Sequence, residues 1–147
     1  MLIDVSIRNC ALAAAIVALA AGCTITRDVR PVSLNDGERE VCIVEDPAVR
    51  EGFLQAYRGR LEEKGYAVRI LPNGSPVTTC PVTSTYMGRW SWDLAIYLNY
   101  AEIIVYRDGA QIGRALYDGR RGGGRVFDKF GNGEKRIHGL VDELFPR

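Results

Sequence analysis

A run of apolar residues near the N-terminus constrains this chain more than any other sequence feature. Residues 10–21 are all apolar, and the only positive charge before them, Arg8, is offset by Asp4. As a helix, twelve residues span about 18 Å, which is shorter than the ~30 Å hydrocarbon core of a bilayer. This length is typical of the apolar region of a signal peptide. We therefore expect residues 1–22 to lie outside the folded domain.

A cysteine follows this run directly, because residues 19–23 read Leu-Ala-Ala-Gly-Cys. The ending resembles a bacterial lipobox, in which the cysteine becomes the first mature residue and carries a diacylglycerol. Ala20 is a departure, since Leu or Val is more usual there, and Thr24 stands where an Asp would signal inner-membrane retention. The sequence predicts acyl chains on Cys23 and the periplasmic face of the outer membrane of a Gram-negative bacterium. The alternative is an ordinary secretory signal with a cysteine beside its cleavage site.

The four cysteines of the chain divide between different chemistries. Cys10 would leave with the signal peptide and Cys23 would be acylated, so Cys42 and Cys80 remain in the mature domain. These two lack the Cys-x-x-Cys spacing of redox catalysts. In an oxidising compartment such a pair is most simply a structural disulfide. Two separate buried thiols are the alternative.

Charge and residue inventory argue against several function classes. Lys and Arg number 19 against 18 Asp and Glu, so the net charge of +1 gives no electrostatic basis for nucleic-acid binding. The single histidine, His138, excludes any site that needs two, and no serine lies in a Gly-x-Ser-x-Gly or Ser-x-x-Lys motif. We predict a non-enzymatic protein with no catalytic residues, no metal and no cofactor. A hydrolase is the least favoured alternative.

The hydrophobic pattern after residue 39 predicts a single α+β domain over residues 40–147. Residues 23–39 are mostly polar and are expected to form the lipidated cysteine and a flexible tether. The expected order is β-α-β-β-β-β-α, a mostly antiparallel sheet in a two-layer sandwich with the helices on one face. Asp46 is expected to cap the first helix, with Pro47 at its first position. The expected strands are 41–44, 66–71, 82–92, 94–106 and 111–117, and the expected helices are 47–64 and 134–145.

Two segments are candidates for ligand binding. Trp90 and Trp92 share one face of the predicted third strand, and Asp93 lies on the other. The glycine-rich run at residues 120–125 offers backbone N–H groups and three guanidinium groups, those of Arg120, Arg121 and Arg125. Together they predict a site for an anionic glycan or lipid, such as lipopolysaccharide phosphates. The alternatives are core packing for the two tryptophans and a solvated loop for the arginines.

Two motifs resemble those of a family of small, uncharacterised proteobacterial lipoproteins. The first is Cys-Ile-x-x-Asp-Pro over residues 42–47, and the second is Ser-Trp-Asp-x-Ala-x-Tyr-Leu over residues 91–98. The resemblance spans residues 41–145 and implies a lipid-anchored envelope protein with a cysteine pair, but it implies no activity or substrate. On this basis the chain is expected to bind or scaffold a partner in the envelope, either a protein or an anionic polysaccharide.

Overall fold

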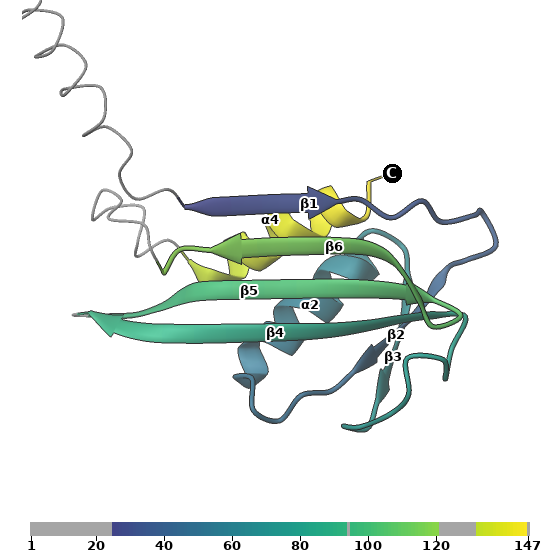
Figure 1. Ribbon diagram of the computed structural model, residues 1–147, viewed down its shortest axis with the longest axis horizontal. Coiled ribbons are helices and arrows are strands. Elements are labelled where there is room, and N and C mark those ends of the chain that lie inside the picture. The colour runs from purple at the N-terminus through teal and green to yellow at the C-terminus, as the bar shows by residue number, and fades with distance from the viewer. Residues whose placement is uncertain (1–24, 94, 121–131, 147) are drawn as a thin grey trace, which may run out of the picture.

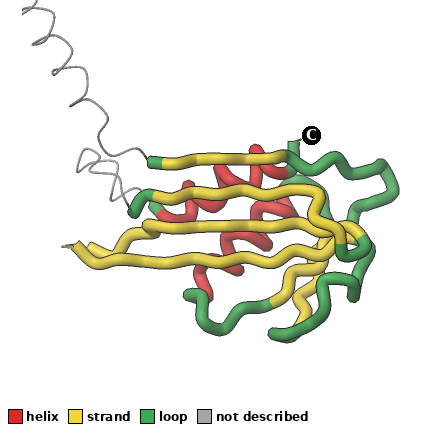
Figure 2. The backbone as a smooth tube through the Cα atoms, in the orientation of Figure 1, coloured by secondary structure: helices red, strands yellow, loops and turns green. Residues whose placement is uncertain are grey.

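The computed structural model describes residues 25–93, 95–120 and 132–146, which form a sheet in one layer and two helices in the other (Figures 1 and 2). Both helices lie against the same face of the sheet. The predicted α+β class and element order are therefore confirmed. The strands are β1 (Thr26–Arg30), β2 (Glu40–Val44), β3 (Ala67–Leu71), β4 (Val82–Asp93), β5 (Ala95–Arg107) and β6 (Ala110–Asp118), and the helices are α2 (Glu51–Glu63) and α4 (Gly133–Leu144).

The sheet has the strand order β1-β6-β5-β4-β2-β3. Strands β4, β5 and β6 form an antiparallel meander, and β1 joins its edge antiparallel to β6. Strand β2 runs parallel to both of its neighbours, β3 and β4. This parallel part follows from connectivity, because α2 carries the chain from β2 back to the start of β3. The sheet is therefore mostly antiparallel, with a short parallel corner.

The prediction of a flexible tether over residues 23–39 is wrong for residues 26–30, which form β1. This strand pairs with β6 along its whole length, from Thr26 with Asp118 to Arg30 with Arg114. Just beyond it, Val32 is buried and its N–H donates to the carbonyl of Leu144 at 2.8 Å. An edge strand is held by its backbone ladder, so it forms here without an alternating apolar pattern.

The first helix begins later than Asp46 predicts. The carboxylate of Asp46 accepts the N–H of Ala48 at 2.9 Å, which closes a turn before the helix, and α2 itself begins at Glu51. At the other end, the expected helix end at residue 64 agrees with the observed last residue, Glu63. Gly65 has a φ of 85°, and its N–H donates to the carbonyl of Glu62. In an Asx turn, as in a helix cap, an Asp side chain accepts a backbone N–H two or three residues later. The same residue therefore suits either structure, which explains why α2 begins later than expected.

The core lies between the helices and the sheet. Tyr57 of α2 is fully buried, and its hydroxyl hydrogen-bonds to the Ser84 hydroxyl at 2.8 Å. Burial raises the pKa of Tyr57 above its usual range, so the side chain stays neutral. The fully buried apolar side chains around this pair come from both layers: Val41, Ile43, Phe53, Leu61, Ile103, Val105, Leu140, Val141 and Leu144.

The two helices are joined at their C-terminal halves by an ion pair. The Arg60 guanidinium donates two hydrogen bonds to the Asp142 carboxylate, each 2.8 Å long, and Lys64 lies 3.4 Å from the same group. These cations hold the pKa of Asp142 below its usual value. In the part of the chain that the structure describes, neither helix is long and apolar enough to cross a membrane.

Candidate functional site

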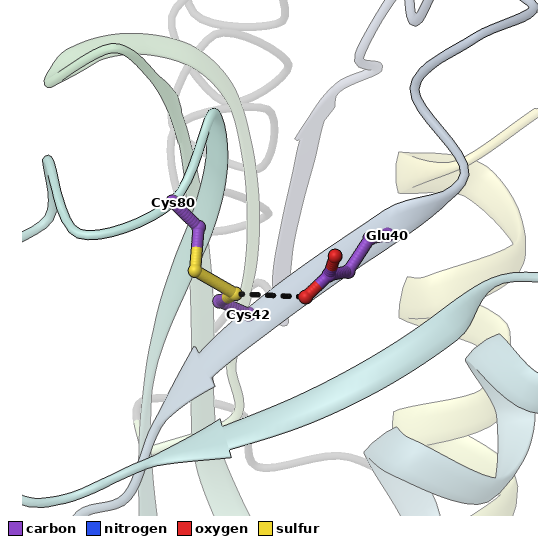
Figure 3. Close-up of side chains that lie close together, drawn as sticks. All are labelled: Glu40, Cys42 and Cys80. Carbon is purple, nitrogen blue, oxygen red and sulfur yellow. Dashed lines mark hydrogen bonds between the residues drawn. A yellow bond between two sulfur atoms is a disulfide. The ribbon is translucent and has the colours of Figure 1, made fainter.

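Cys42 and Cys80 form a disulfide, as the sequence predicts (Figure 3). It links β2 to the loop that leads into β4, and its Cα atoms are 6.3 Å apart. Both cysteines are buried, and they pack with Val44 and Leu71 in a small cluster separate from the main core. Because the sulfurs lie inside this cluster, the bridge fastens the parallel corner of the sheet to the meander.

The same corner contains a group of three potential metal ligands. Glu40 lies beside the disulfide, with its carboxylate oxygen 3.7 Å from the Cys42 sulfur (Figure 3). Both sulfurs are oxidised, however, whereas metal binding by cysteine requires thiolates. Arg69 also pairs with Glu40 at 2.7 Å and approaches the Cys80 sulfur at 3.2 Å. An oxidised pair beside a guanidinium group is unsuited to a cation, so this cluster is structural.

Trp90 and Trp92 are two residues apart on β4, so alternation puts them on one face of the strand, but they have different surroundings. The Trp90 ring packs edge-on against Phe53, with centroids 6.2 Å apart, and the Arg50 guanidinium lies 5.8 Å from its centre. Trp92 lies two residues farther along β4 and is 72% exposed. Core packing therefore accounts for Trp90 but not for Trp92.

A groove of about 660 Å³ lies beside Trp90, between α2 and the first turns of α4. Small residues of α2 form its floor, and the polar side chains of Gln55, Asn132 and Glu134 line it together with Trp90. A Cβ atom on Gly52 or Gly59 would meet nothing within 4 Å. The groove thus combines an aromatic wall with amide and carboxylate groups, which suits a polar ligand with an apolar face.

His138 lies in this groove, where its imidazole is half-buried. Its Nε2 atom is 3.9 Å from a carboxylate oxygen of Glu134, and Glu63 also lines the groove. A hydrolase of the Ser–His type would need a hydroxyl or thiol nucleophile within reach of the imidazole. Among the described residues, the groove lining contains no Ser, Thr or Cys. The described lining therefore does not assemble the Ser–His form of the hydrolase alternative.

Arg120 lies on the other side of the sheet. Its guanidinium group stacks over the Tyr100 ring at 4.7 Å and pairs with Asp118 at 2.6 Å. Tyr100 faces away from the helices, because its neighbour Ala101 is completely buried in the core. Arg120 therefore does not join Trp90 in one site.

The remaining predicted site residues cannot be placed relative to this groove. Cys23, Arg121 and Arg125 fall outside the described residues, and so does the side chain of Asp93. The predicted combination of arginines and tryptophans is consequently not assembled by the residues that the structure describes.

Sequence reasoning missed the bulge that shapes the β4–β5 hairpin. The register between the strands shifts between Arg89 and Trp90, where Asn99 becomes the unpaired residue. The Asn99 amide donates to the Ser91 hydroxyl, and its backbone carbonyl accepts the N–H of Gly119 at 2.8 Å. A sequence signal existed, because Tyr97 and Tyr100 cannot lie on one face of a regular strand. Bulges bend a hairpin, so Asn99 sets the direction of its last residues.

Comparison with known proteins shows similarity at the level of the fold. No protein-family model and no curated protein matches the chain. A dodecamer of a single-residue variant of PelC from Paraburkholderia phytofirmans aligns with a TM-score of 0.58 at 12% identity, covering 84% of this chain and 100% of that one. A PelC dodecamer from the same organism in another crystal form aligns at 0.57 and 12% identity, covering 82% and 98%. The chain therefore shares a fold with these two PelC structures, both of which are dodecamers.

Proposed function

We propose that this chain is a lipid-anchored lipoprotein of the bacterial outer membrane that binds or scaffolds an envelope partner and catalyses no reaction. The observation that carries the proposal is the buried Cys42–Cys80 disulfide. Such bridges persist in the periplasm and are rare in the cytosol. This compartment is the one to which the Leu-Ala-Ala-Gly-Cys ending would direct the chain. The disulfide inside the domain and the targeting signal before it thus both support a periplasmic location.

Metabolic labelling with a palmitate analogue tests the anchor. The wild-type chain should take up the label, and Cys23→Ala should lose it, because the thiol that accepts the diacylglycerol is gone. Cys10→Ala is the matched control and should label normally, since Cys10 lies in the segment that is removed. Equal labelling of wild type and Cys23→Ala would refute the anchor.

We further propose that the chain works as a homo-oligomer. The proposal is motivated by the PelC structures that share this fold, which are dodecamers, and closed assemblies of one chain are the commonest oligomers. Crosslinking in cells, followed by mass spectrometry, should recover multiples of the chain mass together with any envelope partner. Recovery of the monomer alone, at crosslinker levels that capture a known oligomer, would contradict the proposal.

A second candidate function is glycan binding, which the groove beside Trp90 favours. Aromatic rings pack against the apolar faces of sugars, and planar amides and carboxylates bind their hydroxyl groups. Gln55 and Asn132 supply amides here, and Arg50 supplies a cation for an anionic sugar.

Fluorescence titration tests this candidate. In Trp92→Phe the only tryptophan is Trp90, so its emission reports on the groove. Lipopolysaccharide-derived oligosaccharide should change the emission in a saturable way, and Gln55→Ala should weaken the effect. Arg120→Ala, on the opposite face of the sheet, should leave it unchanged. Absence of a saturable change would exclude the groove as a site for this class of ligand.

A further inference from the structure

The tip of the β4–β5 hairpin exposes apolar side chains that the core does not use. Among the described residues, only three large hydrophobic side chains are exposed, and two of them are at this tip: Trp92 at 72% and Ile96 at 56%. They are cross-strand partners in the sheet register. We call this pair the tip pair. Two adjacent apolar side chains at the end of a hairpin form a protruding contact, not a fragment of the core.

The tip of the β4–β5 hairpin lies at the same end of the sheet as the start of β1 (Figure 1). Thr26 pairs with Asp118, Asp118 pairs with Tyr100, and Tyr100 pairs with Arg89, so Thr26 and Arg89 are at the same level. From Arg89, β4 continues four residues to Asp93, about 13 Å at 3.3 Å per residue. The hairpin therefore projects beyond the start of β1.

The chain before β1 is too short to hold the domain away from a membrane. Cys23 precedes Thr26 by three residues, which span at most about 10 Å when fully extended. An acylated Cys23 would be at the lipid surface. With the strands along the membrane normal, the hairpin tip, about 13 Å past the level of Thr26, would reach that surface as well.

Two arginines behind the tip, beside Trp90 and Tyr100, add positive charge. The Arg50 guanidinium lies 5.8 Å from the Trp90 ring, and the Arg89 guanidinium lies 6.0 Å from the Tyr100 ring. Arg50 and Arg89 are both exposed. Neither guanidinium group forms an ion pair with a described carboxylate, in contrast to Arg27 and Arg60. An exposed tryptophan at the tip with arginines behind it is the combination that favours the headgroup layer of an anionic bilayer.

We propose that the tip pair inserts into the headgroup layer of an anionic bilayer and gives the domain a second membrane contact beside the acyl chains of Cys23. This inference rests on the proposed lipid anchor, which fixes the end of the sheet that faces the membrane. Trp92 and Ile96 supply the apolar contact, and Arg50 and Arg89 attract the anionic headgroups. A protein partner on the same tip is the competing outcome.

Quenching by brominated lipids tests the contact. The full chain is purified from membranes of a Gram-negative host and reconstituted in vesicles of phosphatidylethanolamine and phosphatidylglycerol, with bromine atoms near the headgroup end of the acyl chains. Trp90→Phe leaves Trp92 as the only tryptophan, and Trp92→Phe leaves Trp90. On vesicle-bound protein isolated by flotation, we expect the emission of Trp92 to fall by at least half and that of Trp90 to fall by less than half as much.

A second measurement separates the tip from the anchor. Mass spectrometry of the same floated fraction reports whether Cys23 carries a diacylglycerol. Absence of this modification would refute the lipid anchor, whereas the quenching of Trp92 tests the tip contact independently. In Cys23→Ala, which lacks the acyl chains, the tip pair should leave a weak, salt-sensitive binding to the same vesicles. Adding Trp92→Ser and Ile96→Ser should abolish this binding. Adding Met87→Ser instead, at an exposed apolar side chain away from the tip, should have no effect.

Two results would overturn the tip contact. One is quenching of Trp92 no greater than that of Trp90 in vesicle-bound protein. The other is a pair of observations: no lipid quenching of Trp92 in Trp90→Phe, and loss of crosslinked oligomers in Trp92→Ser. Together they would assign the tip to a protein interface.

Discussion

The two ends of strand β4 differ in how far the rest of the molecule covers them: the first is buried and the last is exposed. At its start, Val82, Thr83 and Ser84 are essentially inaccessible, and the loop before them is bridged to β2 by Cys80. At its end, Trp92 is 72% exposed. Both ends have side chains that alternate between the two faces of one sheet. The difference arises because the helix layer stops short of the hairpin tip, near Phe53 and Trp90.

This contrast separates residues that hold the fold from residues that are available for contacts. Side chains at the bridged end are enclosed on all sides, so changes there act on the free energy of unfolding. Side chains at the tip lie beyond the helices, so changes there act on what the domain touches. The following predictions test this division, from the largest expected loss of stability to the smallest.

The largest effect is expected from Cys42→Ala combined with Cys80→Ala. The disulfide closes a loop with a sequence separation of 38 residues. In the chain-entropy model, its loss lowers the free energy of unfolding by about 3–4 kcal/mol. Urea unfolding followed by circular dichroism measures this change. Wild-type protein treated with a thiol reductant should unfold at nearly the same midpoint as the variant. An unchanged midpoint would mean that the bridge does not stabilise the corner.

Gly88→Ala should destabilise the middle of β4. A Cβ atom there would lie 2.7 Å from the Phe53 ring and 2.9 Å from the Trp90 ring, so both rings must move. Overpacking of this kind costs about 1–3 kcal/mol, measurable by thermal unfolding. Gly59→Ala on α2 is the control, because its Cβ would meet nothing, and it should raise stability by up to ~1 kcal/mol. Equal effects of the two substitutions would contradict the close packing around Gly88.

Tyr57→Phe tests the buried hydrogen bond near the bridged end. It removes the donor or acceptor that Ser84 uses at 2.8 Å, while Ser84 keeps its bond to the carbonyl of Ile104 at 3.0 Å. We expect a loss of about 1 kcal/mol in the free energy of unfolding, measured by urea unfolding. Half-buried Tyr106 provides the control, since Tyr106→Phe should change stability less. A neutral Tyr57→Phe would show that the hydroxyl pair contributes nothing net.

Trp92→Ser should have the smallest effect on stability, within about 0.5 kcal/mol, because the side chain is mostly exposed. Trp90→Ser should be clearly more destabilising, since Trp90 packs against Phe53. Thermal unfolding of the two variants side by side gives the comparison directly. If Trp92→Ser is as damaging as Trp90→Ser, the tip belongs to the core and the division between the two ends of β4 fails.

The sequence predicts the element order because each long element carries its own pattern. The meander strands alternate, and the face of α4 repeats Ile137, Leu140, Val141 and Leu144, all of which are buried. Strand β1 escaped prediction because residues 26–30 are four polar residues around Val29, and an edge strand needs backbone partners more than apolar ones. Which strand lies at an edge is a tertiary property that local pattern does not contain.

The site was harder to predict than the fold for a similar reason. Alternation places Trp90 and Trp92 on one face, but it does not show how far a helix layer extends over that face. The grouping of tryptophans with Arg120 failed because the two lie on opposite sides of the sheet, which depends on the register of β5 with β6. The disulfide was predictable because only two cysteines remained once the N-terminal signal had been set aside.

Strand β1 sets the distance between the domain and whatever holds its N-terminus. Because it fixes the chain to the sheet within a few residues of Cys23, an anchored domain could not move freely on a long linker. From Ala95 to Arg107, the first and last residues of β5, the strand spans about 40 Å at 3.3 Å per residue. With the hairpin tip at the lipid, the bridged corner would stand at that height above the bilayer. A partner that contacts this corner would therefore bind at a fixed distance from the membrane, to a domain whose orientation is also fixed.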